Sequence, residues 1–209
     1  MNAPPAPIPP AGLSRVAILI SGAGSNMVRL VETLQAPGSP GEAVCVVSDD
    51  SGAAGLARAQ ALGVPTAVVE GQAHRGDREG FDAALARALA PHAPDLLCLA
   101  GFMRILGPDF VTARAGRILN IHPSLLPAFR GLDTHARALA AGARVHGCTV
   151  HVVTPALDDG PVLGRARVSV HPGDTPATLA ARVQAEEHAL YPEVLRRVLA
   201  GGALPVMRG

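Results

Sequence analysis

The chain has 209 residues, of which 48% are hydrophobic and only 2% aromatic, and its formal net charge is +1. This length can bury the core of one domain, whereas the scarcity of aromatic rings and of excess positive charge argues against a nucleic-acid or membrane-binding protein. All 18 basic residues are Arg, and a chain without Lys cannot carry a Walker phosphate loop, a pyridoxal Schiff base or a lysine-activated serine.

The chain begins with a Pro- and Ala-rich stretch, and we expect a disordered tail over residues 1–14. No basic region precedes an apolar one there, which argues against a signal peptide, and no apolar run elsewhere has the length of a membrane span. Three widely spaced cysteines, Cys45, Cys98 and Cys148, are typical of reduced, buried thiols. We therefore expect a cytoplasmic protein with a single domain over residues 15–209.

The first half of that domain alternates short apolar runs with stretches of helical spacing. Each apolar run has the length of a buried strand, and the helical stretches end near Gly or Pro. This alternation predicts a Rossmann-like, doubly wound α/β fold with a mostly parallel sheet. The expected strands cover residues 15–20, 44–48, 65–69, 95–100 and 117–121, and the expected helices cover residues 27–34, 53–62 and 77–89.

The second half of the domain has a different pattern. Two apolar runs flank an acidic Asp-Asp-Gly-Pro turn, which predicts an antiparallel pair of strands. A long closing helix is expected at the end of the chain, interrupted or shifted around Tyr191-Pro192. The ranges expected here are a proline-enforced loop at 122–127, a short helix at 134–141, strands at 147–153 and 162–170, and the closing helix at 175–199.

A glycine-rich turn, Gly22-Ala-Gly-Ser-Asn26, joins the first strand to the first helix. Glycine permits tight turning, and the free amides and dipole of a helix start favour an anion, to which the Ser and Asn add donors. An ordinary capped turn without a ligand is the simpler alternative. A dinucleotide site, with Asp49 or Asp50 on a ribose, is disfavoured because Met27 stands where the third glycine of that fingerprint belongs. The pattern favours a single phosphate.

Polar residues also follow the later strands. Ligands of open parallel sheets bind beyond the carboxyl ends of strands, where Asn120 and His122 end the fifth strand and Asp158 lies in the acidic turn. Asn120 and His122 are two residues apart, so on an extended segment they face the same side. An amide N–H and an imidazolium can both donate to an oxygen that gains charge in acyl transfer, and a nearby carboxylate can hold the imidazole. Because no nucleophile elbow is recognisable, direct attack by a substrate amine is the simplest mechanism.

Each of these residues also has a structural interpretation. A buried His often bonds only a backbone carbonyl, and an Asp in a turn often only caps it. Catalysis by the three residues and a purely structural role therefore both stay open at this point. We expect no metal, because the other histidines lack a familiar ligand spacing. Those expected to be surface or structural are His74, His92, His135, His146, His151, His171 and His188.

Taken in order, five motifs of the sequence closely resemble the phosphoribosylglycinamide formyltransferase family, the folate-dependent enzymes of purine synthesis. The resemblance runs from about Arg15 to the end of the chain with similar spacing, and the ordered set is far more specific than any one motif. The motifs are Ile20-Ser-Gly-Ala-Gly-Ser-Asn26, Leu99-Ala-Gly-Phe-Met-Arg-Ile-Leu106, Leu119-Asn-Ile-His-Pro-Ser-Leu-Leu-Pro127, Leu157-Asp-Asp-Gly-Pro161 and Glu187-His-Ala-Leu-Tyr-Pro192.

The resemblance implies transfer of a formyl group from 10-formyltetrahydrofolate, as co-substrate, to the glycyl amine of phosphoribosylglycinamide. It implies a phosphate-binding half over about residues 15–100 and a folate and catalytic half over about residues 101–209. The substrate-binding positions that it implies are Gly24, Ser25 and Asn26 for the phosphate and Glu187 for the ribosyl part.

The resemblance also implies roles on the folate and catalytic side. Asn120 matches the amide that stabilises the oxyanion, His122 the general acid, and Asp158 the carboxylate that supports the protonated histidine. The folate-binding positions that it implies are Arg78, Met103, Arg104, Ile105, Leu106 and Asn120.

Four positions matter for how closely the chain follows the family. The family has a cis peptide that would here be Leu126–Pro127. Ala23 stands where Asn is common, Asp133 where some members have His, and Asp159 where Gly is common. Asp159 places a second carboxylate beside Asp158, so which of the two faces His122 is open, although alignment favours Asp158.

Related enzymes and a binding module are the alternatives. Methionyl-tRNA formyltransferase carries a further C-terminal domain and a basic surface, and we expect neither here, because the sequence ends at Gly209 and is nearly neutral. Formyltetrahydrofolate deformylase, a hydrolase, has an extra domain before the first strand and needs no phosphate-bearing amine. A non-catalytic nucleotide-binding module would leave Asn120, His122 and Asp158 idle. We expect small-molecule substrates, no nucleic acid or membrane partner, and a monomer or homodimer.

Overall fold

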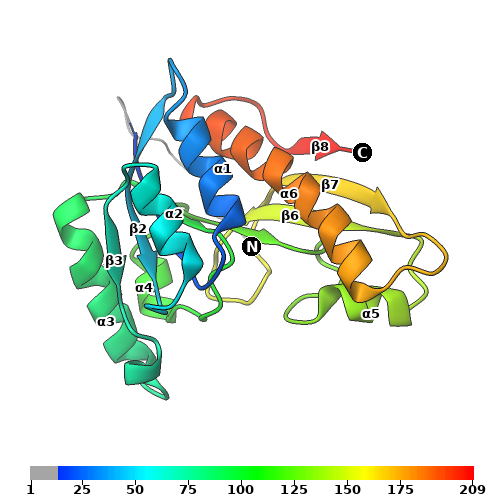
Figure 1. Cartoon of the computed structure of the whole chain (residues 1–209), viewed down its shortest axis with the longest axis horizontal. Coiled ribbons are helices and arrows are strands. Elements are labelled where there is room, and N and C mark those ends of the chain that lie inside the picture. The colour runs from blue at the N-terminus through cyan, green and yellow to red at the C-terminus, as the bar shows by residue number, and fades with distance from the viewer. Residues whose placement is uncertain (1–13) are drawn as a thin grey trace.

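The computed structural model describes residues 14–209, which form one eight-stranded sheet in the order β3-β2-β1-β4-β5-β6-β7-β8 (Figure 1). Strands β1 to β5 pair in parallel, β6 is antiparallel to β5 and β7, and β8 is parallel to β7. The strands are β1 (Ser14–Ile20), β2 (Gly41–Ser48), β3 (Thr66–Val68), β4 (Leu96–Leu99), β5 (Ile118–His122), β6 (Val145–Val152), β7 (Val162–Ser169) and β8 (Val206–Arg208).

Helices cover both faces of this sheet and bury two aliphatic cores. Helices α1, α2 and α6 pack on one face, and α3 and α4 pack on the other (Figure 1). The helices are α1 (Ser25–Leu34), α2 (Ala54–Ala61), α3 (Arg78–Leu89), α4 (Pro108–Thr112), α5 (Thr134–Ala140) and α6 (Pro176–Leu199), with 3-10 turns at Gln72–His74 and Ala90–His92. Within residues 14–209, no helix is both long and apolar enough to cross a membrane.

The structure confirms the predicted doubly wound sheet and antiparallel pair, with element ends shifted by a few residues. Helix α6 continues through Tyr191-Pro192 rather than breaking there. Helix α4 and strand β8 were not predicted, because each is too short to show a period. The expected tail lies outside the described residues, except for Ser14, which begins β1. The Leu126–Pro127 bond is cis, as the family resemblance implied, and Leu204–Pro205 is also cis.

The strand order fixes where a ligand can bind. The chain runs outward from β1 to β3 and then returns to β4 on the other side of β1. Such a reversal opens a crevice beyond the carboxyl ends of the two strands, because the following helices lie on opposite faces. Here the crevice lies between the start of α1, which follows β1, and the loop that follows β4.

Candidate active site

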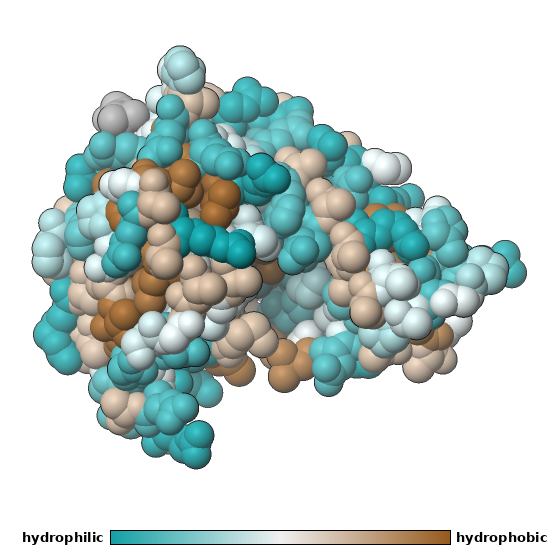
Figure 2. Space-filling model, viewed as in Figure 1, coloured by the Kyte–Doolittle hydropathy of each residue, from teal (hydrophilic) through white to brown (hydrophobic). Residues whose placement is uncertain are grey.

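A cavity of about 840 Å³ occupies this crevice. It is lined by the β1–α1 turn, the segment after β4, the end of β5, the acidic turn between β6 and β7, and the first half of α6. Figure 2 shows the surface hollowed between the part formed by α1 and α2 and the part formed by α6. The cavity therefore brings the glycine turn and the strand-end residues into one space.

The glycine turn presents a helix start whose backbone amides are free. Gly24 has a φ of 70°, a left-handed conformation, and no side chain caps α1. The first N–H groups of a helix have no partner within the helix, so those of Gly24, Ser25 and Asn26, which line the cavity, are available as donors for an anion. This geometry agrees with the single-phosphate interpretation of the sequence.

Gly55, at the start of α2, packs against this turn, and its role was not predicted from the sequence. Its N–H donates to the Gly22 carbonyl at 3.0 Å. A Cβ on Gly24 would lie 2.9 Å from the Gly55 Cα, and a Cβ on Gly55 would lie 2.5 Å from the Ile20 side chain. Both positions therefore require glycine so that α2 can pack against the turn. In the sequence, Gly55 is a single Gly in an Ala-rich stretch, and this pattern by itself does not indicate a contact with the turn.

Two side chains of α6 contact the start of α1. The Asn26 amide donates to Glu187 Oε2 at 2.8 Å, and both residues are buried. Burial raises the pKa of Glu187, and the hydrogen bond from Asn26 opposes that rise. Gln184, which sequence reasoning did not single out, donates to Ser25 Oγ at 3.3 Å. The predicted positions Gly24, Ser25, Asn26 and Glu187 thus share one wall of the cavity.

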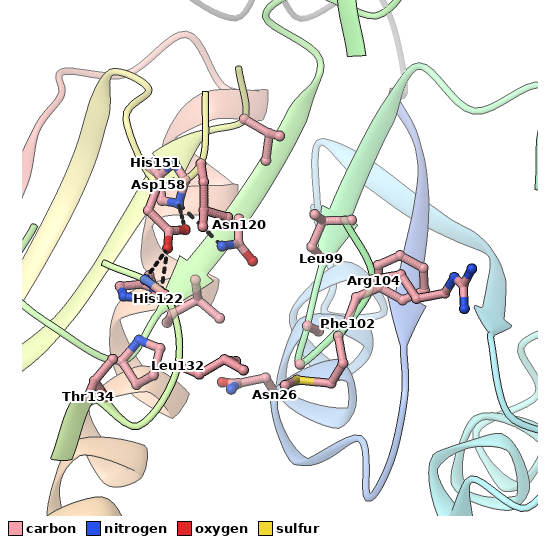
Figure 3. A pocket seen from close by; sticks show the side chains of 18 of the residues that line it. Asn26, Leu99, Phe102, Arg104, Asn120, His122, Leu132, Thr134, His151 and Asp158 are labelled. Carbon is pink, nitrogen blue, oxygen red and sulfur yellow. Dashed lines mark hydrogen bonds and ion pairs between the residues drawn. The ribbon is translucent and has the colours of Figure 1, made fainter. Parts of the chain in front are cut away.

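Asn120 and His122 lie on the facing wall, at the carboxyl end of β5 (Figure 3). Antiparallel pairing places Asn120 opposite His151 of β6. The Asn120 Nδ2 atom lies 3.2 Å from His151 Nε2, while His151 Nδ1 lies 3.0 Å from the Val152 carbonyl. Because a carbonyl can only accept, Nδ1 carries the hydrogen and Nε2 accepts from Asn120. This contact fixes the Asn120 amide and leaves its second N–H available.

His151 was expected to be a surface or structural residue, and the structure places it, buried, in the cavity wall beside Asn120. Burial lowers its pKa, which favours the neutral ring that accepts from the amide. The sequence signal for this contact is the register of β5 against β6, which depends on how two distant segments pair. His135 also lines the cavity, whereas His146 is buried and its pKa is lowered to about 4, chiefly by burial.

Asp158 lies between the two histidines (Figure 3). Its Oδ2 atom is 3.4 Å from His122 Nδ1 and accepts from the Gly131 N–H at 2.9 Å, while Oδ1 is 3.7 Å from His151 Nε2. Asp159 forms an ion pair with Arg130 at the surface. The question left open by the sequence is therefore answered in favour of Asp158 as the carboxylate that faces His122.

The hydrogen-bond partners of His122 define where its proton can be. Its Nε2 atom lies 3.0 Å from the Phe129 carbonyl, so Nε2 carries a hydrogen. The other nitrogen, Nδ1, faces the Asp158 carboxylate, and two lone pairs repel unless a proton lies between them. Nδ1 and the carboxylate are therefore close enough for a proton to pass between them, and both side chains are buried at the cavity wall.

The segment after β4 lines the mouth of the cavity. Met103, Arg104, Ile105 and Leu106 all contribute to the lining, and the Met103 and Ile105 side chains are largely exposed there. The Arg104 guanidinium points away from the cavity, as Figure 3 shows. It donates to the carbonyls of residues 71 and 74 and lies over the Phe81 ring.

Arg78 differs from the other predicted positions. It is exposed at the start of α3 and is absent from the residues that line the cavity. The structure therefore brings together every predicted site residue except Arg78. In residues 14–209, no three His, Cys, Asp or Glu side chains are grouped to hold a metal ion.

The chain is similar to proteins named as formyl transferases, both in sequence and in structure. The formyl transferase family model matches residues 14–195. The phosphoribosylglycinamide formyltransferase of Escherichia coli K12 is 45% identical over 180 residues, which cover 86% of this chain and 84% of that protein. A solved structure of phosphoribosylglycinamide formyltransferase from Brucella melitensis is 51% identical with a TM-score of 0.84, covering 92% of this chain and 99% of that one.

Longer proteins match as well. The trifunctional purine biosynthetic protein adenosine-3 of Gallus gallus is 46% identical over 187 residues, which cover 90% of this chain. This chain spans only 18% of the length of that relative. The similarity to it therefore concerns one part of a much longer protein.

Proposed function

The chain belongs to the phosphoribosylglycinamide formyltransferases of the formyl transferase family, and on this premise we propose that it formylates the glycyl amine of 5-phosphoribosylglycinamide. The formyl donor is 10-formyltetrahydrofolate, and the products are formylglycinamide ribonucleotide and tetrahydrofolate, in purine biosynthesis. One observation supports this most: Asn120, His122 and Asp158 face the same cavity as a helix start that is suited to a phosphate.

The substrate is anchored by its phosphate and ribosyl groups. The free amides at Gly24, Ser25 and Asn26 bind the phosphate, because they are donors at the positive end of a helix dipole. The Glu187 carboxylate accepts from the ribosyl part. Held at these points, the substrate extends its glycyl amine across the cavity toward Asn120 and His122, which removes much of the entropic barrier to attack.

The folate co-substrate enters at the mouth of the cavity. Backbone groups of residues 103–106 hold the pterin, and Asn120 lies where the formyl group is delivered. Arg78 and Arg104 are on the outer side of this segment, where a folate carboxylate extends into solvent. Arg104 reaches such a carboxylate by releasing its bonds to the carbonyls of residues 71 and 74.

The chemical step is direct attack by the amine. The amine nitrogen forms a bond to the formyl carbon, and the C=O electron pair moves to the oxygen, which becomes an oxyanion. The available N–H of Asn120 and the cationic form of His122 stabilise that charge. The bond from carbon to the folate nitrogen then breaks with its electron pair on that nitrogen, which takes up a proton as the attacking amine loses one.

His122 and Asp158 handle the proton of this exchange. A proton on His122 Nδ1, which Asp158 Oδ2 faces, is given to the leaving nitrogen, and the proton from the amine replaces it. His151 keeps the Asn120 amide in its donating orientation. No step requires a metal ion.

The proposed compartment, oligomeric state and division of the chain are those expected from the sequence. We propose a cytoplasmic enzyme that acts on small molecules as a monomer or homodimer, with the phosphate-binding half over about residues 15–100 and the folate and catalytic half over about 101–209. The three cysteines are buried free thiols, which suits a reducing compartment.

The experiment that tests the proposed function also separates it from a hydrolase. Purified protein is mixed with 10-formyltetrahydrofolate, with and without phosphoribosylglycinamide, and tetrahydrofolate release is followed. We expect release only when the amine is present. Equal release without it would indicate a deformylase, and no release with both would indicate a non-catalytic binding module.

A further inference from the structure

The cavity segment that follows β4 has no regular secondary structure. Residues 101–106 all line the cavity, and the segment ends at Gly107, the N-cap residue just before α4. A segment without helix or strand bonds keeps its shape only through contacts with its surroundings. Its shape matters, because under the proposed function its backbone receives the pterin.

Several contacts hold this segment, among them the hydrogen bond from the Ser21 N–H to the Gly101 carbonyl at 3.2 Å and the packing of Phe102 and Leu106 against the core. Two further contacts lie toward the solvent. The Ser21 hydroxyl accepts from the Met103 N–H at 2.8 Å, in an exposed position. The Arg104 side chain holds two carbonyls of the segment before α3, in a partly buried position. Hydrogen bonds that water can replace contribute little to holding a backbone in place.

Another contact is buried and involves a charged group. The Gly107 N–H donates to Oδ2 of Asp82, on α3, at 2.7 Å. Asp82 is buried, and its Oδ1 atom has no hydrogen-bond partner within residues 14–209. Burial raises the pKa of Asp82, while the Gly107 N–H and three nearby arginines, Arg78, Arg104 and Arg114, oppose the rise. A buried carboxylate used for one backbone bond needs an explanation.

Gly107 itself is shaped by this contact. Its φ is −70°, which any residue can adopt, so the backbone does not require glycine there. A Cβ would instead overlap Asp82 Oδ2. The absence of a side chain at residue 107 is therefore explained by the close approach of the carboxylate.

Asp82 is also close to both arginines of the folate side. Arg78 lies one turn before it on α3, and Arg104 lies within the segment that it holds. One carboxylate thus acts behind the cavity wall on the backbone of the segment and on the two cations that flank it.

We propose that Asp82 is a positioning residue, which holds residues 101–107 in the conformation that receives the folate co-substrate. This inference rests on the proposed function for the identity of the co-substrate. Asp82 does not line the cavity and does not act on the reacting atoms. It acts through the Gly107 N–H, in the way that outer groups orient binding groups in other sites.

The test compares Asp82→Ala, Asp82→Asn and Gly107→Ala with a control, Asp109→Asn, an exposed acid in α4. We expect Asp82→Ala to raise KM for 10-formyltetrahydrofolate about tenfold or more, the scale for losing a buried bond to a charged group. KM for phosphoribosylglycinamide and kcat should change by less than about twofold. Asp82→Asn should restore most of the affinity, because its amide oxygen can still accept from Gly107.

Gly107→Ala keeps the carboxylate but displaces it, so it should raise the same KM, whereas Asp109→Asn should leave it unchanged. Equal changes in both KM values, or no change in either, would overturn the proposal. Hydrogen–deuterium exchange of residues 101–107 gives a readout without substrates: Asp82→Ala should speed exchange there and leave residues 24–34 unchanged. Unchanged exchange would also overturn it. Failure of the wild type to transfer formyl groups would count against the proposed function alone.

Discussion

The two walls of the cavity present different chemical groups, backbone amides on one and side chains on the other. The phosphate wall, residues 22–26, presents backbone amides whose positions follow from glycine conformation and helix geometry. The formyl wall, Asn120, His122, His151 and Asp158, presents side chains whose positions depend on contacts between distant segments. Asn120 and His151, for example, are 31 positions apart in the sequence.

This difference suits one wall to binding the phosphate and the other to the chemical step. Backbone amides offer fixed partial charges that cannot titrate, which suits holding a phosphate. Side chains of the formyl wall can exchange a proton and respond to charge that develops during a reaction. Under the proposed function, damage to the phosphate wall should therefore appear in KM for phosphoribosylglycinamide, and damage to the formyl wall should appear in kcat.

The largest effect is expected on the formyl wall. His122→Ala should lower kcat by about 10²-fold or more, the usual scale for loss of a general acid, with little change in KM for phosphoribosylglycinamide. Steady-state kinetics with the exposed His171→Ala as control would check this. Near-normal turnover in His122→Ala would contradict the assignment.

A smaller effect is expected on the phosphate wall. Gly24→Ala forces a side chain into a left-handed backbone and toward Gly55, so it should raise KM for phosphoribosylglycinamide about tenfold, for a cost of about 1–2 kcal/mol. The value of kcat at saturation should stay close to normal. Gly38→Ala is the matched control, because Gly38 has a φ of 75° with no atom near its absent Cβ. If kcat fell in Gly24→Ala and not in Gly38→Ala, the assignment of phosphate binding to one wall and of chemistry to the other would be wrong.

The smallest effect concerns Glu187 and pH. Burial raises its pKa above the unfolded value, so the folded protein holds this proton more tightly, and ionisation costs stability as pH rises through the folded pKa. Glu187→Gln removes that cost. Its Tm should match the wild type below about pH 4, where the carboxyl is neutral in both states. The Tm difference should grow between the unfolded and the folded pKa and stay constant above the folded pKa, where both states are ionised. Its affinity for phosphoribosylglycinamide should fall several-fold. A Tm difference that shrinks as pH rises would contradict the account.

What the sequence could predict follows the same division. The phosphate wall is contained in five consecutive residues. The first half alternates continuous apolar runs, typical of buried strands, with stretches of helical spacing, so both the wall and these elements were predictable. Asn120 and His122 were predictable as a pair because they are two residues apart on one strand. Alignment favoured Asp158 over Asp159, and the structure agrees, because Asp158 faces His122 while Arg130 binds the second carboxylate.

Other parts of the site could not be predicted, for physical reasons. His151 reaches Asn120 only through the register of an antiparallel pair, which depends on packing between distant segments. Gly55 and Asp82 act through close approaches between a helix and a turn or loop, and single residues in a helical pattern carry no sign of such neighbours. Arg78 and Arg104 were assigned by resemblance, and neither guanidinium faces the cavity interior in this structure.

The central claim is that one wall anchors the phosphate and the other carries out the transfer. The most direct test measures kcat/KM for phosphoribosylglycinamide and for its riboside without phosphate, using wild type, Gly24→Ala and His122→Ala. Removal of the phosphate should lower kcat/KM of the wild type by roughly 10²-fold, the scale of two charge-assisted hydrogen bonds. This fold-decrease in kcat/KM on removal of the phosphate should be much smaller in Gly24→Ala and as large as in the wild type in His122→Ala. The claim would be contradicted if removal of the phosphate lowered kcat/KM of Gly24→Ala as much as that of the wild type, or if it no longer lowered kcat/KM of His122→Ala.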